Sequence, residues 1–170
     1  MQAEIRAHTR EPWATVEADD NYVLASWQQI FAVVWRQDTT LEGVQALHRE
    51  CRKFATKHAR GIGLLTIVSA KAPMPPSPVR QAVADFLAQG STYIKCSAVL
   101  MEGTGFRAAA VRSVVTGLTM LARQAYPHRV CSLPDAVTLL AHTLPVASNP
   151  AVNPTALRAA IDELRQRALP

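Results

Sequence analysis

Two short apolar stretches open the part of the chain in which hydrophobic positions follow a regular pattern. Residues 22–27 and 30–35 are rich in β-branched and aromatic side chains, and only Gln28 and Gln29 separate them. Runs of this kind predict two strands paired as an antiparallel hairpin. The second run is too continuously apolar for a solvent-facing side, which predicts a strand in the interior of a sheet.

Helical spacing and short apolar runs then alternate. Thr39 and Glu42 match a capping box at the start of a first predicted helix. The expected elements after the hairpin are a helix over 40–58, a strand over 63–68, a helix over 77–89, a strand over 94–101, a helix over 106–124, a strand over 128–132 and a helix over 133–143. Helices that alternate with buried strands predict an α/β fold: a four- to five-stranded, mostly parallel mixed sheet with an N-terminal antiparallel hairpin and flanking helices.

The pattern divides the chain into three segments. Residues 1–20 lack periodicity, so we expect a flexible N-terminal arm. Residues 21–144 form the predicted α/β domain. Residues 145–170 contain a linker rich in Pro and Asn and then an amphipathic helix, on which Leu157, Ile161 and Leu164 share one stripe.

The composition is that of a globular protein without a membrane-spanning segment. Hydrophobic residues make up 49% and charged residues 18% of the chain, as in a globular protein. No apolar run is long enough to span a bilayer and no secretory signal opens the chain, so we expect a cytoplasmic location. The net charge of +5 comes from scattered residues without a Lys/Arg block and interleaved aromatics, which makes nucleic acid an unlikely partner.

The sequence carries no recognisable catalytic, metal or cofactor motif. Cys51, Cys96 and Cys131 lack ligand spacing, so we expect buried free thiols. The histidines are scattered, and neither GxSxG nor HExxH occurs. His48 lies beside Cys51 on the apolar side of its helix, which favours core packing over a catalytic pair. We therefore expect no catalytic residues and no enzymatic activity.

Two helix starts could bind an anion. Gly103, Thr104 and Gly105 precede a helix, where backbone N–H groups can hold an anion and Arg107 could add charge. The alternative is a plain strand-to-helix turn. Ser77, before Pro78, predicts an N-cap; phosphorylation of Ser77 is the alternative.

The helix predicted over 106–124 has almost no polar face. Val114, Leu118 and Leu121 are among its apolar residues, and such a helix has to be covered on most sides. Either the C-terminal stripe of Leu157, Ile161 and Leu164 covers it, or another protein or a second copy does. These six residues are the predicted interaction surface.

Several segments resemble a known family. They are 22–24 leading into 31–36, 40–43 at the start of the first helix, 103–107 after a strand, and 129–131 before a helix at 135–136. Over 22–144 the chain resembles the STAS fold of sulfate transporters and anti-sigma-factor antagonists, and more closely the bacterial anti-sigma-factor-antagonist-like domains of STAS/Sec14 type. The resemblance implies a non-enzymatic domain that docks onto a partner protein, or in some relatives holds a nucleotide or lipid. The phosphorylatable serine of such antagonists matches Ser77 in position only, because the Asp and Gly of its motif are missing here.

We therefore expect a bacterial, non-enzymatic regulatory or scaffolding module that acts by contact with another protein or by self-association. The alternative is a carrier or sensor of an anionic or lipid ligand at Gly103, Thr104 and Gly105. A deep pocket beside Gly103 would favour the carrier, and a flat apolar patch would favour the interaction module.

Overall fold

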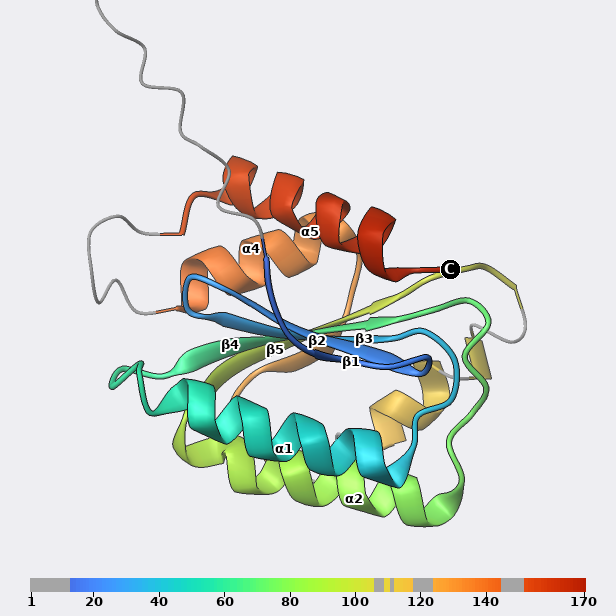
Figure 1. Ribbon diagram of the computed structural model, residues 1–170. Helices are drawn as coiled ribbons and strands as arrows, with labels where there is room; N and C mark the ends of the chain where they lie inside the picture. Colours follow the sequence, from blue (N-terminus) through green and yellow to red (C-terminus); the bar gives the residue numbers. More distant parts are fainter. Residues whose placement is uncertain (1–12, 106–108, 111, 118–123, 145–151) are drawn as a thin grey trace, which may run out of the picture.

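A single mixed sheet organises the chain (Figure 1). The computed structural model describes residues 13–105, 109–110, 112–117, 124–144 and 152–170. Its six strands lie in sequence order and are β1 (Ala14–Ala18), β2 (Tyr22–Trp27), β3 (Ile30–Trp35), β4 (Ile62–Val68), β5 (Ile94–Met101) and β6 (His128–Val130). Pairing is antiparallel from β1 to β3 and parallel from β3 to β6. The predicted α/β class and the β2–β3 hairpin are confirmed.

Strand β1 differs from the prediction. It raises the strand number above the expected four or five, and it lies within the segment predicted as a flexible arm. Its side chains are mostly exposed, so it has no hydrophobic pattern to detect. Pairing with β2 and burial of Trp13 hold it in place: Trp13 is 2% exposed, and its Nε1 donates to the carbonyl oxygen of Ala160 at 2.8 Å.

Helices cover both faces of the sheet (Figure 1). On one face lie α1 (Leu41–Ala55) and α2 (Ser77–Gln89), and on the other lie α4 (Leu133–Thr143) and α5 (Pro154–Ala168). A short 3₁₀ turn, η1 (Gly90–Thr92), follows α2. Within the helix predicted over 106–124, the described residues 109–110 and 112–117 are helical and Gln124 is not. None of the described helices is both long and apolar enough to cross a membrane.

Two predicted helix caps are wrong by one residue. The Oγ1 of Thr40, not Thr39, accepts the backbone N–H of Gly43 at 3.0 Å. In α2 the N-cap position belongs to Pro76, and Ser77 is the first helical residue without a side-chain capping bond. Thr40 has the extended backbone that a capping side chain requires, and in α2 the proline has taken that position.

One apolar cluster lies on each face of the sheet. The α4/α5-side core contains Leu157, Ile161 and Leu164, each 0% exposed. The α1/α2-side core contains Leu47, Phe86 and the other apolar side chains of that face. The described part of the C-terminal segment is therefore packed against the domain. The division at 1–20, 21–144 and 145–170 stays a prediction where the structure does not describe the chain.

Candidate functional site

The outer surface of α1 carries a shallow hollow of about 520 Å³. We call the residues that line it the α1 basic face; they are Gln45, His48, Arg49, Arg52, Lys53 and Thr56. Successive members lie three or one residues apart, which places them on one side of a helix. The opposite side of α1, with Val44, Leu47 and Cys51, is buried.

Close packing at Gly43 fixes α1 against the sheet. A Cβ atom at this position would lie 2.8 Å from Cζ3 of Trp35 and 2.9 Å from Cδ1 of Tyr22. Any larger side chain would therefore push the start of α1 away from β2 and β3. The short separation brings the first half of the α1 basic face within reach of β1 and β2.

Positive charge gathers toward the C-terminal end of α1. The side chains of Arg49 and Lys53 are 58% and 74% exposed, and Arg52 is exposed as well. Lys57 extends the charge beyond the helix. The pKa of His58 is lowered by burial and then by the positive charge of Lys57, so this end of the helix favours the neutral imidazole.

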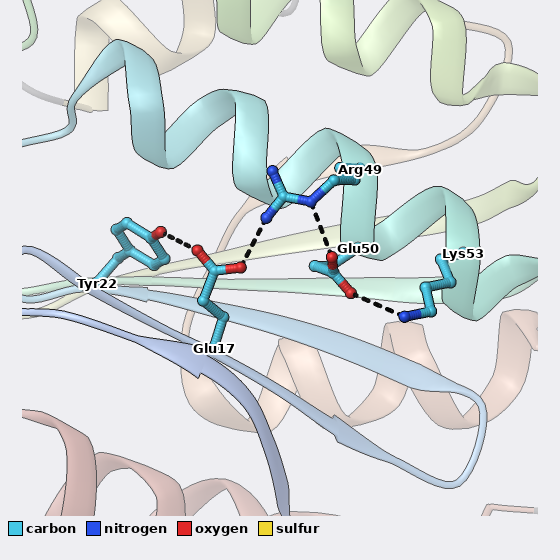
Figure 2. Close-up of polar contacts among 5 residues, drawn as sticks. All are labelled: Glu17, Tyr22, Arg49, Glu50 and Lys53. Carbon is cyan, nitrogen blue, oxygen red and sulfur yellow. Dashed lines mark hydrogen bonds and ion pairs between the residues drawn. The ribbon is translucent and has the colours of Figure 1, made fainter.

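A hydrogen-bonded network links β1 to α1 (Figure 2). The Oε1 of Glu17 accepts from the hydroxyl of Tyr22 at 2.6 Å, and its Oε2 accepts from Nη2 of Arg49 at 2.7 Å. The Nε of Arg49 donates to Oε1 of Glu50 at 2.9 Å, while Nζ of Lys53 lies 3.9 Å from Oε2 of Glu50. Burial and then the bond to Glu17 raise the pKa of Tyr22 to about 12, so the phenol stays a donor.

The three cations of the α1 basic face are not equally compensated. Arg49 contacts two carboxylates, those of Glu17 and Glu50. Lys53 has one long contact with Glu50. Arg52 makes no ion pair within the part of the chain that the structure describes. Positive charge is therefore available for an external anion at Arg52 and Lys53.

The predicted anion-binding turn follows β5. Gly103 and Gly105 have φ values of +89° and +95°, a backbone region that glycine adopts without strain. A Cβ atom on Gly103 would lie 2.9 Å from the Cβ of Ala70, so close packing also favours glycine there. Thr104 is exposed, and Arg107 lies outside the described residues. Anion binding at this turn stays a prediction.

The six residues of the predicted interaction surface are not brought together. Val114 is partly buried against the α1/α2-side core, and Leu118 and Leu121 lie outside the described residues. Leu157, Ile161 and Leu164 are buried in the α4/α5-side core, on the opposite face of the sheet. The C-terminal stripe is buried within its own chain, but against α4 and the sheet. The alternative in which it covers the helix predicted over 106–124 is therefore wrong for the described residue Val114.

Ser77 is an exposed residue in the first turn of α2. Arg80, the nearest basic residue on this helix, donates from Nη1 to the carbonyl oxygen of Pro75 at 3.2 Å. Pro76 and Pro78 carry no backbone N–H, so this helix end offers fewer donors to an anion than an ordinary one. Phosphorylation of Ser77 stays a prediction.

Other chemistry-bearing side chains are buried or partly buried. The ring of His48 lies 5.7 Å from that of Phe86, and burial raises the pKa of the Cys51 thiol. On the same face of the sheet, Nδ1 of His128 lies 2.9 Å from Oγ of Ser97, and burial lowers the pKa of His128 to about 4. Among the described residues, no three His, Cys, Asp or Glu side chains gather as metal ligands would.

Sequence reasoning missed the residues of the network and of the α1 basic face. The spacing of Arg49, Arg52 and Lys53 on the polar side of a predicted amphipathic helix could have drawn attention to them. Nothing in the sequence pairs Glu17 with Arg49, because that contact depends on β1 and its register.

Comparisons of the chain with protein-family models, with curated proteins and with solved structures each found no match.

Proposed function

We propose that this chain is a non-enzymatic interaction module that binds an acidic surface of a partner protein through the α1 basic face. The observation that carries the proposal is the shallow hollow on α1, with Arg52 free of a carboxylate partner among the described residues and Lys53 held only loosely. Exposed cations attract an acidic partner over several ångströms and orient it before contact.

The shape of the hollow supports a protein partner over a small ligand. Sites for small molecules are usually concave, largely apolar and able to bury most of the ligand. The α1 basic face is a strip along a single helix, lined by charged and polar side chains. A strip of this kind suits a partner helix or an extended acidic segment.

Nucleic acid is less well supported than an acidic protein. Proteins that bind single strands combine positive charge with aromatic side chains on which bases stack. The lining of the α1 basic face contains His48 but no Phe, Tyr or Trp, and His48 is itself packed on Phe86. Nucleic acid is nevertheless one of the outcomes of the experiment below.

The finer features belong to the same proposal. The order of hairpin, helix and parallel strands supports the STAS-like resemblance, which implies docking onto a partner protein. A cytoplasmic, bacterial regulatory module that also self-associates would fit this interpretation.

The experiment removes the two available cations. We expect hexaglutamate peptide to bind the chain weakly at low ionic strength, followed by NMR chemical-shift titration. The double variant Arg52→Gln/Lys53→Gln should weaken binding about three- to tenfold, as expected for two exposed charge contacts. Added salt should weaken binding to the original chain, because it screens exposed charges.

Two controls decide the result. Arg158→Gln removes an exposed arginine of α5 and should leave the affinity unchanged, and hexaglutamine peptide should not bind. Absence of hexaglutamate binding, or equal losses from Arg158→Gln and the double variant, would contradict the proposal. Binding of an oligothymidylate that depends on Arg52 and Lys53, in place of hexaglutamate binding, would indicate a nucleic-acid partner.

A further inference from the structure

A β-bulge sets the direction of the Glu17 side chain. In the pairing of β1 with β2, Thr15 lies opposite Ala25, but Glu17 lies opposite Leu24, with the register shifted between them. Ala25 belongs to the α4/α5-side core and Leu24 to the α1/α2-side core. In a regular strand residues two apart share a face. The extra residue, Val16, therefore turns Glu17 from the side of α5 to the side of α1.

The donors that hold Glu17 belong to elements other than β1. Tyr22 belongs to β2, is 5% exposed and packs edge-on against Trp35 at a ring-centroid distance of 5.8 Å. Arg49 belongs to α1 and is held by Glu50 through its Nε. The two donors approach different oxygens of one carboxylate from different elements (Figure 2). They would remain in position if the carboxylate came from elsewhere.

The acceptor, in contrast, is a partly exposed side chain on an edge strand. Strand β1 is at the edge of the sheet, and four of its five side chains are exposed. The Glu17 side chain itself is 36% exposed. Only the side chain has to rotate away, because the pairing with β2 and the buried Trp13 keep the strand itself in place. The carboxylate of Glu17 can therefore be replaced without disturbing the apolar clusters.

We propose that Tyr22 and Arg49 form a carboxylate subsite at the N-terminal half of the α1 basic face, that Glu17 occupies it as an internal ligand, and that a Glu or Asp side chain of an acidic partner segment takes its place. The inference rests on the proposed function and specifies its chemistry. Arg52 and Lys53 attract the partner, and the Tyr22–Arg49 pair orients one of its carboxylates. Glu17 then competes with the partner and lowers its affinity.

The test removes the internal competitor. Glu17→Gln should tighten hexaglutamate binding about two- to fivefold, the size expected for one exposed ion pair. In an Arg49→Gln background the same substitution should give no gain, because the guanidinium that both carboxylates contact is missing. Glu17→Asp keeps the charge but shortens the side chain, so it should tighten binding in the same direction by less.

Glu163→Gln is the matched control. Glu163 of α5 is 39% exposed and lies 3.8 Å from its partner Arg167, so the substitution changes the net charge equally at a remote ion pair. Equal tightening by Glu163→Gln and Glu17→Gln would assign the effect to net charge and overturn the subsite. The same holds if Glu17→Gln and Glu17→Asp both leave the affinity unchanged.

The proposed function and the subsite fail in different ways. If Arg52→Gln/Lys53→Gln weakens binding while the Glu17 variants have no effect, the α1 basic face stands and the subsite is wrong. If none of the variants binds hexaglutamate, both are wrong. Urea unfolding of each variant establishes that it is folded, and a folded Glu17→Asp chain decides the subsite should Glu17→Gln not fold.

Discussion

Helices α1 and α5 have the same length, fifteen residues, and both end in a basic turn. Their cations nevertheless differ in the partners that they contact. In α5, Nε and Nη2 of Arg165 donate to the two oxygens of Glu102 at 2.6 and 2.8 Å. Arg167 donates to the carbonyl oxygen of Trp13 at 3.3 Å. In α1, Arg52 has no carboxylate partner among the described residues.

The difference teaches that basic residues near a helix C-terminus have two uses that sequence alone does not separate. In both helices they complement the negative end of the helix dipole. Glu102, after β5, and Trp13, before β1, lie beside α5, so the cations of α5 bond to groups of the same chain. Solvent lies beside the outer surface of α1, so its cations remain available to another molecule.

Strand β1 connects the two helices. Its N-terminal neighbour, Trp13, faces α5 and bonds Ala160, whereas Glu17 faces α1 and bonds Arg49. The bulge between Thr15 and Glu17 lets one short strand contact both sides of the sheet. Strand β1 therefore links the α4/α5 side of the sheet to the α1 basic face.

The largest expected effect on stability is in the α4/α5-side core. Ile161→Ala should lower the free energy of unfolding by about 2–5 kcal/mol, because the Ile161 side chain is 0% exposed and its truncation leaves a cavity in the core. Urea unfolding followed by circular dichroism measures it. The exposed neighbour variant Arg158→Ala should cost less than about 0.5 kcal/mol. A loss below about 1 kcal/mol for Ile161→Ala would mean that α5 is not part of the cooperative core.

Acid should lower the stability of the protein through His128, which lies on the α1/α2 side of the sheet. Ser97 alternates with Cys96 and Ala98 of the α4/α5-side core, so it points toward the α1/α2 side, and His128 pairs with it. Burial lowers the pKa of His128 from 6.5 to about 4, so folding favours the neutral ring. Its contribution to stability is complete above pH 6.5 and is lost as the pH falls toward 4.

The expected size is about 2–3 kcal/mol lost between pH 7 and pH 4.5, from about 1.4 kcal/mol for each unit of pKa shift. Urea unfolding at both pH values gives the loss for the original chain and for His128→Gln, whose side chain does not titrate. Between the two pH values, His128→Gln should lose about 2–3 kcal/mol less free energy of unfolding than the original chain. Equal losses would mean that the buried ring is not a source of the acid sensitivity.

Apolar patterning accounts for most of the fold that could be predicted. The runs at 22–27 and 30–35 give β2 and β3 with their bounds, because continuous burial leaves a signal that needs no tertiary information. The helix stripes give α1, α2, α4 and α5 within a few residues. Strand β1 could not be predicted because exposed residues and a bulge erase the alternation that marks a strand.

The candidate site was harder to predict because it depends on contacts between distant residues. Glu17 and Arg49 are separated by 32 positions, and their contact requires both the bulge and the close approach of α1 at Gly43. The stripe of Leu157, Ile161 and Leu164 is apolar in the sequence and buried in the structure. Its position on the α4 side of the sheet depends on chain topology, which local patterns do not encode.

The smallest expected effect is the sharpest test of the comparison between α1 and α5. Arg165→Gln removes a two-bonded ion pair whose partners are 32% and 21% exposed, and should lower the free energy of unfolding by about 1 kcal/mol. Arg52→Gln removes a cation without a described carboxylate partner and should cost between about 0 and 0.5 kcal/mol. High salt should reduce the first loss and leave the second unchanged, since only the first involves a charge pair. Urea unfolding of both variants at low and high salt measures the difference. Equal losses would mean that Arg52, like Arg165, stabilises the fold, and the α1 basic face would then lose the cation on which its availability to a partner depends.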